Sequence, residues 1–254
     1  MSEFKDKVVI VTGASGGLGG TVIDLFAADG AKMVLLDMNK EKLEKVAQEK
    51  CKNDYLTFAV NISDEDQIKE VVDKTVEKFG RIDVLINVAG IAGPAVLTED
   101  YSYEDFKKVF AVNVFGDFLT MKYVIPVMKK QKSGAIVNTA STSGMVGCPL
   151  EVGYGASKWA VIGLTHDAAS ENTNGGVRIN SVSPGWMKTN MLAEIMENYK
   201  VFGEIEKEED FDASPMGRPG EPIEIANTIY FLASEKASFI NGANFVVDGG
   251  ATIF

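Results

Sequence analysis

The chain has 254 residues, of which 46% are hydrophobic and 24% charged, the balance of a globular protein with a substantial core. Its formal net charge of −11 opposes binding to phosphate backbones, so we expect no nucleic-acid partner. The single histidine, His166, excludes a zinc site built from histidines, and two cysteines offer no disulfide framework.

No apolar run reaches the roughly 18–20 residues that span a bilayer, so we expect no membrane segment. The segment Met1–Lys7 lacks the apolar core of a signal peptide and leads directly into an apolar run. Together these features predict a cytoplasmic protein.

Short apolar runs alternate with helical stretches along the whole chain. The runs are near-continuous in Val, Ile and Leu, which is typical of strands buried on both faces in a parallel sheet covered by helices. Seven strands in this alternation predict one doubly wound α/β domain over residues 1–254, since right-handed crossovers leave few other topologies. The predicted strands are Val8–Val11, Met33–Leu36, Leu56–Val60, Val84–Asn87, Ala135–Asn138, Arg178–Val182 and Asn244–Val247, and the predicted helices are Leu18–Ala28, Glu41–Glu49, Asp64–Phe79, Tyr103–Lys130, Tyr154–Thr173 and Pro222–Leu232.

The stretch 184–218 breaks this alternation between a strand and a helix. A segment this long inside a compact domain is usually functional, often as a lid over a site. Met191–Tyr199 within it has helical spacing, so we predict a partly helical substrate lid.

A glycine-rich turn joins the first predicted strand to the first helix. Its glycines let the backbone approach a pyrophosphate, and the helix N-terminus offers free N–H groups and the positive end of its dipole. The competing interpretation is a turn that only packs helix on sheet, but its position after an N-terminal strand favours a dinucleotide site. The residues expected to contact the dinucleotide here are Gly13, Ser15, Gly16, Gly17, Leu18 and Gly19.

Asp37 ends the second predicted strand. A carboxylate there accepts hydrogen bonds from the adenosine ribose hydroxyls and repels a 2′-phosphate. Neither Ser15 nor Met38 supplies a cation for that phosphate, so the sequence favours NAD over NADP. The alternative is that Asp37 is a solvated turn residue.

Tyr154 and Lys158 lie four residues apart at the start of a predicted helix, so their side chains share a face. The ordinary pKa of tyrosine, about 10, must be lowered for proton transfer at neutral pH. A nearby ammonium and a positive nicotinamide would both favour the phenolate. A lone Tyr-x-x-x-Lys also arises by chance, as an unremarkable helical pair.

Several further motifs share the order and spacing of one known family. Taken with the tyrosine–lysine pair, they make the chain similar to the short-chain dehydrogenase/reductase family, which has a Rossmann-type fold, over essentially its whole length. The matching residues are Thr12-Gly13 with Gly17-Leu18-Gly19, Asn87-Val88-Ala89-Gly90, Asn113, Ser141, Tyr154 with Lys158, Pro184-Gly185 with Thr189, and Asp248-Gly249-Gly250.

The resemblance implies that Tyr154 protonates a carbonyl oxygen or removes an alcohol proton, while Ser141 orients that oxygen. It implies that Lys158 lowers the Tyr154 pKa and binds the nicotinamide ribose, and that Asn113 holds a water that passes protons toward solvent. Because hydride moves directly between substrate and nicotinamide, the protein mainly supplies position and electrostatics. The further cofactor contacts it implies are Met38, Asn61, Ile62, Asn87, Ala89, Gly90, Pro184, Gly185, Met187 and Thr189.

Two positions depart from the family pattern. Val88 replaces the second asparagine of the strand end, and Asn61 stands where many members have an aspartate that meets the adenine amino group. An amide carbonyl still accepts that hydrogen bond, and Ile62 would pack on the adenine. We expect neither change to affect the chemistry.

The residues expected around the substrate are mainly apolar, although ordinary core packing is the competing interpretation for each. They predict a pocket for a neutral secondary alcohol or ketone, with cyclic alcohols and steroid- or bile-acid-like rings as candidates. The family resemblance also implies a homo-oligomer, a dimer or tetramer, formed by the long helices. The substrate residues are Ser141, Ser143, Met145, Leu150, Trp186 and Met191.

Two other functions stay open. One is an NADPH-dependent 3-oxoacyl-(acyl-carrier-protein) reductase on the same fold, against which Asp37 and the negative charge argue. The other is a dinucleotide-sensing protein without turnover, which would usually have lost Tyr154 or Lys158; both are present.

Overall fold

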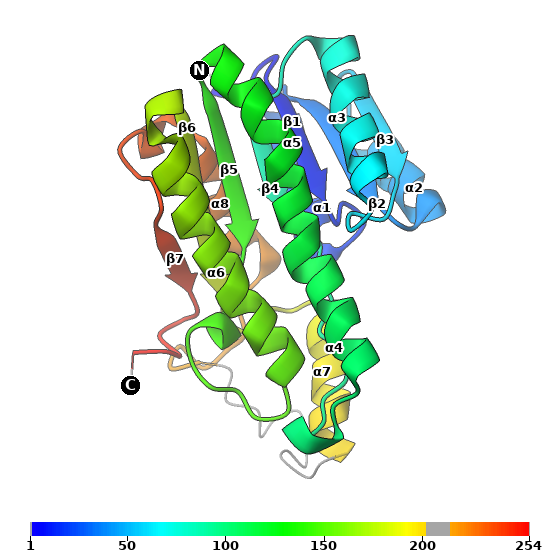
Figure 1. The fold of residues 1–254 in the computed structure, drawn as a ribbon, viewed down its shortest axis with the longest axis vertical. Helices are drawn as coiled ribbons and strands as arrows, with labels where there is room; N and C mark the ends of the chain where they lie inside the picture. Colours follow the sequence, from blue (N-terminus) through cyan, green and yellow to red (C-terminus); the bar gives the residue numbers. More distant parts are fainter. Residues whose placement is uncertain (1, 202–213, 254) are drawn as a thin grey trace.

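The computed structural model describes residues 2–201 and 214–253. At their centre is a seven-stranded parallel sheet with the strand order β3-β2-β1-β4-β5-β6-β7 (Figure 1), which confirms the predicted doubly wound fold. The strands are β1 Val8–Thr12, β2 Lys32–Asp37, β3 Tyr55–Ala59, β4 Val84–Asn87, β5 Gly134–Thr139, β6 Val177–Pro184 and β7 Asn244–Val247, and the α-helices are α1 Gly17–Ala28, α2 Lys40–Lys50, α3 Glu65–Phe79, α4 Tyr103–Phe110, α5 Gly116–Gln131, α6 Val152–Asn172, α7 Asn190–Val201 and α8 Pro222–Ala233.

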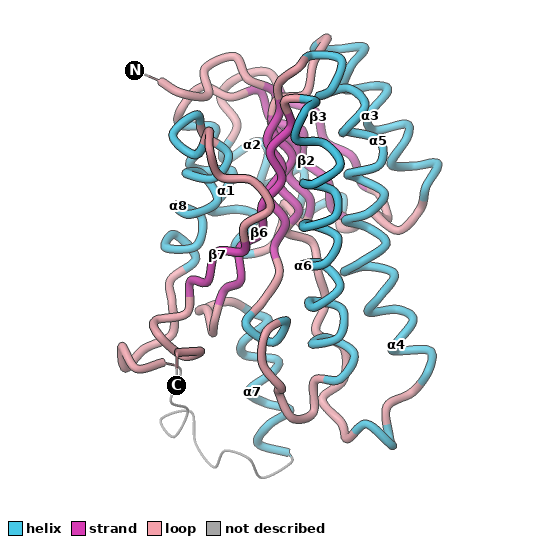
Figure 2. The backbone as a smooth tube through the Cα atoms, turned by 60° about the vertical axis from the view of Figure 1, so that its left-hand side comes forward, coloured by secondary structure: helices cyan, strands magenta, loops and turns pink. Residues whose placement is uncertain are grey.

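Helices cover both faces of the sheet, as Figure 2 shows. On one face, apolar side chains of α1, α2 and α8 pack on the strands, and on the other those of α3, α5 and α6 do so. All five residues of β1 are buried, as the unbroken apolar run predicts for a strand with helices on either side.

The strand order reverses beside β1, which pairs in parallel with β2 on one side and with β4 on the other. After β1 the chain continues to β2 on one side of the sheet, and after β4 it continues to β5 on the other side. In sheets of this type a crevice opens at that point, outside the carboxyl ends of the strands, and ligands bind there.

The single helix predicted over Tyr103–Lys130 is helical throughout, but its hydrogen-bond pattern changes in the middle. A π-helical turn, Ala111–Phe115, separates α4 from α5. This wider turn directs the buried Asn113 side chain inward, where its amide contacts both the Ile91 peptide and Ser157. Such turns are rare and recur at functional sites.

Among the described residues, one stretch, Tyr103–Gln131, has the length and composition to cross a membrane. Half of its most apolar window is buried inside the protein, and Leu119, Met121 and Val124 of α5 belong to the core on that face of the sheet. Burial of this kind is also expected of a core helix of a globular domain.

Helix α7 confirms the helical segment predicted at Met191–Tyr199, and it lies beyond the carboxyl ends of the strands (Figures 1 and 2). Leu192, Ile195 and Met196 on this helix are buried. Residues 202–213 of the predicted lid lie outside the described residues.

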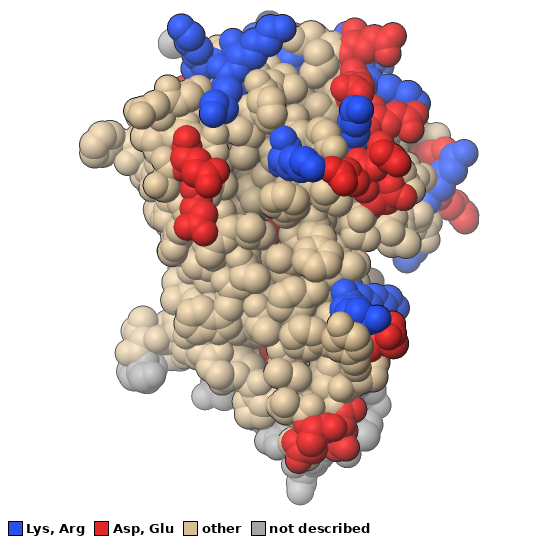
Figure 3. Space-filling view, in the orientation of Figure 1, with Lys and Arg blue, Asp and Glu red and all other residues tan. Residues whose placement is uncertain are grey.

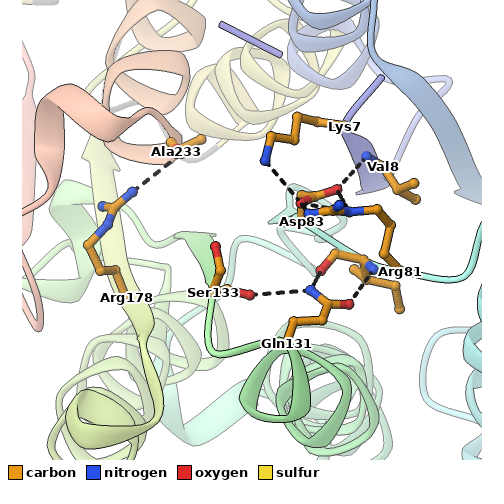
Figure 4. Close-up of polar contacts among 9 residues, drawn as sticks. Lys7, Val8, Arg81, Asp83, Gln131, Ser133, Arg178 and Ala233 are labelled. Atoms are coloured by element: carbon orange, nitrogen blue, oxygen red, sulfur yellow. Dashed lines mark hydrogen bonds and ion pairs between the residues drawn. The ribbon is translucent and has the colours of Figure 1, made fainter. Parts of the chain in front are cut away.

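A buried carboxylate fastens the opposite, amino-terminal edge of the sheet (Figure 4). Asp83, just before β4, accepts hydrogen bonds from the Val8 N–H at 2.9 Å and from the Arg81 guanidinium at 2.6 to 3.1 Å. Nearby, the Gln131 side-chain amide pairs with both backbone groups of Ile82. These contacts join the start of β1, the start of β4 and the end of α5.

We expect Asp83→Ala to lower the free energy of unfolding by about 1–3 kcal/mol, because it leaves the Val8 N–H buried without an acceptor. Lys7→Ala is the matched control, since the Lys7 ammonium is 3.5 Å from Asp83 and its side chain is 41% exposed. Its effect should stay below about 1 kcal/mol. Urea denaturation of the two variants measures both values, and equal losses would contradict the structural role of Asp83.

Candidate active site

A cavity of about 460 Å³ opens at the carboxyl edge of the sheet, where the strand order reverses. It extends from Asp37 after β2 to Tyr154 on α6 and Trp186 after β6. The segments that follow β1, β2, β4, β5 and β6 all contribute to its wall, together with α7. Residues far apart in the sequence thus share one site.

The glycine turn after β1 lies directly against the loop after β4. The Thr12 hydroxyl accepts hydrogen bonds from the backbone N–H groups of Val88 and Ala89, at 3.0 and 3.1 Å. A Cβ on Gly13, whose φ is +64°, would lie 2.8 Å from the Ala89 Cα. This close approach leaves only backbone at the start of α1, a shape that fits the diphosphate of a dinucleotide.

Asp37 is held beside this turn by two backbone donors. Its carboxylate accepts the N–H of Ser15 and the N–H of Asn39, both at 3.0 Å. Lys42 also lines the cavity there, a cation that the sequence analysis did not identify, while Met38 is exposed. The predicted adenosine end therefore carries both a carboxylate and an ammonium.

The other predicted cofactor contacts fall into two groups. The Asn61 carbonyl accepts two hydrogen bonds from Ser63, so it is already engaged within its own turn. Asn87 does not line the cavity, because its amide is buried between Asn138 and Thr120. The predicted cofactor residues that do line the cavity are Gly13, Ser15, Gly16, Gly17, Leu18, Gly19, Asp37, Met38, Asn61, Ile62, Ala89, Gly90, Tyr154, Lys158, Pro184, Gly185, Met187 and Thr189.

Ser141, Tyr154 and Lys158 meet at the inner end of the cavity. The Ser141 side chain is hydrogen-bonded to Tyr154 and also accepts the Ser143 N–H at 3.2 Å. Lys158 is buried; its ammonium donates to the Thr139 carbonyl at 2.7 Å and lies 5.6 Å from the centre of the Tyr154 ring. The geometry thus brings together three of the four predicted catalytic side chains on the cavity wall.

Burial dominates the electrostatics of this cluster. Burial and the charge of Glu151 raise the pKa of Tyr154, and the hydrogen bond with Ser141 lowers it, so that together they bring the pKa to about 12. The tyrosine–lysine pair predicted a lowered pKa, whereas the pKa of Tyr154 is raised here. Proton transfer at neutral pH therefore requires an added positive charge beside the phenol. Burial also lowers the pKa of Lys158, and the carboxylate of Asp117 opposes that change.

Asn113, the fourth predicted catalytic residue, stands behind the cavity wall. Its carbonyl accepts the Ile91 N–H at 2.9 Å, and its amide donates to the Ile91 carbonyl and to the Ser157 hydroxyl. A Cβ on Gly90 would lie 3.3 Å from the Asn113 Oδ1 and 3.5 Å from the Lys158 Nζ. Asn113 therefore joins the loop after β4 to α6 next to Lys158.

The predicted substrate residues divide in a similar way. Ser141, Trp186 and Met191 line the cavity, whereas Ser143, Met145 and Leu150 lie behind its wall. Ser143 donates to the Glu151 carboxylate at 2.8 Å, and the Met145 sulfur accepts from Asn244. The alternation of strands and helices in the sequence does not reveal which of these side chains face the cavity.

Glu151 is the main lining residue that the sequence analysis missed. It is buried, borders the cavity and precedes Tyr154 by three residues, one helical turn, and that spacing is the signal that could have found it. Its charge lies close enough to raise the Tyr154 pKa. The remaining lining residues not predicted individually are Lys42, Val60, Val88, Ile91, Val112, Thr139, Ala140, Thr142, Asn190, Leu192 and Ile195.

Tyr101 packs tightly behind Tyr154. A Cβ on Gly93 or on Gly153 would each lie 2.5 Å from the Tyr101 hydroxyl oxygen. That hydroxyl is buried without a hydrogen-bond partner among the described residues, and burial raises its pKa. The two glycines and the ring therefore fit together as one packed unit at the start of α6.

Comparison with known proteins places this geometry in a family. Residues 13–252 match the family model described as enoyl-(acyl carrier protein) reductase. The 3-oxoacyl-(acyl-carrier-protein) reductase of Thermotoga maritima is 39% identical over 253 residues, which covers 99% of this chain and all of that protein. The chain belongs to the short-chain dehydrogenase/reductase family.

Other members of the family show the range of ligands that proteins of this shape accept. The meso-2,3-butanediol dehydrogenase of Serratia marcescens is 40% identical, over 98% of this chain and 96% of its own. A crystal structure of levodione reductase superposes with a TM-score of 0.92 at 38% identity, over 97% of both chains. Structures of NAD⁺-bound xylitol dehydrogenase and of ElxO with NADP bound both reach 0.89, at 33% and 35% identity over 98% of this chain and 100% and 99% of theirs.

We expect Gly19→Ala to weaken NADH binding by about tenfold or more, equivalent to about 1.4 kcal/mol. The added Cβ would lie 2.2 Å from the Gly13 carbonyl oxygen, so the turn must open. Fluorescence titration with NADH measures the affinity.

Gly20→Ala is the control for this variant, because its Cβ would have ordinary contact with the Lys50 side chain at 3.7 Å. Alanine favours a helix over glycine by about 0.5–1 kcal/mol, so this variant should bind NADH normally and be at least as stable as the wild type. Normal NADH binding by Gly19→Ala would contradict the assignment of the turn.

Proposed function

We propose that this chain is an NAD-dependent dehydrogenase/ketoreductase that interconverts an apolar secondary alcohol and the corresponding ketone. The observation that carries the proposal is the meeting of Ser141, Tyr154 and Lys158 at one end of a cavity whose other end holds Asp37. The nicotinamide would accept or donate the hydride. The chain itself would bind both reactants, orient them and move a proton.

In the proposed mechanism, the Tyr154 hydroxyl gives its proton to the carbonyl oxygen in reduction, and its phenolate takes the alcohol proton in oxidation. The Ser141 hydroxyl, hydrogen-bonded to Tyr154, orients the same substrate oxygen. The Lys158 ammonium adds positive charge beside the phenol and holds the ribose hydroxyls. Asn113 would keep Lys158 connected to solvent through a bound water.

The preference for NAD is supported by Asp37, whose fixed carboxylate would accept the ribose hydroxyls and repel a 2′-phosphate. Lys42 acts in the opposite direction, because its ammonium lies at the same end of the cavity. We give more weight to Asp37, since two backbone N–H groups fix its position.

The preference for an apolar substrate is supported by the part of the cavity wall that Trp186, Met191, Leu192 and Ile195 form. Cyclic and steroid-like alcohols fit that wall by their chemistry. The carboxylate of Glu151 is the polar exception beside the reacting position.

A second candidate is reduction of 3-oxoacyl groups on an acyl carrier protein. Two observations favour it: the likeness to the Thermotoga maritima reductase and the position of Lys42, which could meet the 2′-phosphate of NADPH. The net charge of −11 argues against a partner that is itself acidic.

We also propose that the chain forms a homo-oligomer in the cytoplasm. Tyr103, Phe115, Phe118 and Trp159 are exposed aromatic residues on the α4–α5 and α6 segments, and Figure 3 shows few charged side chains over the middle of this face. Apolar patches of this kind favour association.

The two cysteines, Cys51 and Cys148, are free thiols, which fits a reducing compartment.

The cofactor choice is tested by nicotinamide absorbance with NAD or NADP and a panel of linear, cyclic and steroidal secondary alcohols. We expect turnover with NAD, and we expect Asp37→Ala to raise the ratio of kcat/KM for NADP over NAD by about tenfold, because it removes one repulsion of the 2′-phosphate. Lys42→Ala should lower NADP use further. A wild-type preference for NADP would instead support the 3-oxoacyl reductase.

Tyr154→Phe should lower kcat by about 10²- to 10⁴-fold, because positioned proton transfer is lost. Alcohol oxidation needs the phenolate, and burial raises the pKa of Tyr154 to about 12, so the wild-type oxidation rate should rise from pH 7 to pH 10. Carbonyl reduction needs the neutral hydroxyl and should stay nearly constant over that range. Stopped-flow absorbance measures both directions.

The control for this experiment is NADH binding, which Tyr154→Phe should retain, because the glycine turn and Asp37 are unchanged. Wild-type turnover by this variant would overturn the assignment of the proton donor. NAD binding by the wild type without turnover of any alcohol or ketone in the panel would favour the dinucleotide-sensing alternative.

A further inference from the structure

A buried carboxylate that the proposed mechanism does not use lies on the first turn of α5. Asp117 is 2% exposed, and its Oδ1 has no hydrogen-bond partner among the described residues. An ionised carboxylate withdrawn from water is costly unless a positive charge or a set of donors compensates it. Asp117 therefore requires a nearby cation or a proton of its own.

The fold brings Asp117 toward the catalytic lysine. Asp117 follows Asn113 by four residues, directly after the π-helical turn, and both side chains are buried. Asn113 donates to the Ser157 hydroxyl at 2.9 Å, and Ser157 is the residue before Lys158 on α6. This contact holds the π-helical turn, which leads directly into the first turn of α5, against the segment of α6 that carries Lys158.

The buried ammonium of Lys158 likewise requires a nearby negative charge to remain protonated. Lys158 is 4% exposed, and among the described residues its ammonium has one hydrogen bond, to the Thr139 carbonyl on β5. Burial lowers the pKa of Lys158, and the charge of Asp117 raises it. Reciprocally, burial raises the pKa of Asp117, and the charge of Lys158 limits that rise.

The other titratable groups around this cluster act on the phenol. Glu151, before α6, and Cys148 both raise the pKa of Tyr154. The elements packed around Lys158 otherwise present uncharged groups to it: the Thr139 carbonyl on β5, Gly90 after β4 and the Asn113 amide. A counter-charge for the ammonium thus comes from α5.

We infer that Asp117 is a positioning residue for proton transfer, whose carboxylate keeps Lys158 in its charged form so that Lys158 can stabilise the Tyr154 phenolate. This inference rests on the function proposed above. Among the described residues, Asp117 is not one that lines the cavity, so it would act through Lys158. When it is neutralised, the buried lysine releases its proton more readily, and the phenolate loses its stabilising charge.

The test is Asp117→Asn, which keeps the shape and removes the charge. We expect the rising limb of the pH profile for alcohol oxidation to move to higher pH by about one unit, a tenfold loss of kcat/KM at any pH on that limb. Asp117→Glu, which keeps a carboxylate, should move the limb less than Asp117→Asn does.

Thr120→Val is the matched control for structural damage. Thr120 lies one turn further along α5 and is buried, and its hydroxyl donates to the Asn87 Oδ1 at 3.0 Å and to the Asp117 backbone carbonyl at 2.9 Å. The variant therefore disturbs the same turn but keeps the Asp117 carboxylate. Loss of the Thr120 hydroxyl should lower Tm, as the loss of any buried hydrogen bond would, and leave the pH profile where the wild type has it.

A second readout does not require turnover. With NAD present, the phenolate absorbance of Tyr154, taken as the difference between each protein and its Tyr154→Phe counterpart, should appear at higher pH in Asp117→Asn than in the wild type. If Asp117→Asn does not fold, Asp117→Glu carries the same comparison, with a smaller shift in the same direction expected.

An unchanged or lower titration midpoint in Asp117→Asn, or in Asp117→Glu if Asp117→Asn does not fold, would overturn the inference. It would leave the proposed function standing if the wild type oxidises an alcohol. Conversely, a wild type that turns over no alcohol or ketone fails the proposed function, while the absorbance titration still decides the electrostatic role of Asp117.

Discussion

The parallel direction of all seven strands is the constraint on which the site depends, because it brings every carboxyl end of the sheet to one edge. Within that edge, the loops after β1 and β4 are pressed together through the Thr12 hydroxyl and the absence of a side chain at Gly13. Backbone atoms therefore form the dinucleotide end of the cavity, and side chains from β5 and α6 form its chemical end.

The chemical end places charge where the protein interior disfavours it. A buried ammonium, a partly buried phenol and two buried carboxylates, Asp117 and Glu151, gather around one short stretch of α6. Beneath them, neutral amides and hydroxyls are joined in a satisfied network: Asn87 donates to Asn138, and Asn138 donates to Thr165. Because the side chains of this network are neutral and hydrogen-bonded to one another, the nearby charged groups interact mainly with each other.

Most of the architecture could be predicted because buried strands and glycine turns leave a local signal in the sequence. The runs around Val8 and Val84 are apolar throughout, and the turn after Thr12 allows few interpretations. The orientation of single side chains leaves no such signal, so Asn87 and Met145 were expected at the cavity although both pack away from it.

Buried charges were the harder problem. In the sequence, Asp117 and Glu151 look like the many solvated acids of a chain with a net charge of −11. Only the folded contacts distinguish them. The π-helical turn before Asp117 was equally hidden, because an extra residue in one turn hardly disturbs the apolar periodicity of a long helix.

The packing of Tyr101 against Gly93 and Gly153 has a consequence for how this family member can diversify. Gly93 has a φ of +75°, a backbone conformation that favours glycine whatever surrounds it. Gly153 is helical, and a side chain there is restricted only by the ring of Tyr101. A larger residue at 153 therefore requires the Tyr101 ring to move or residue 101 to be smaller, which couples the two positions.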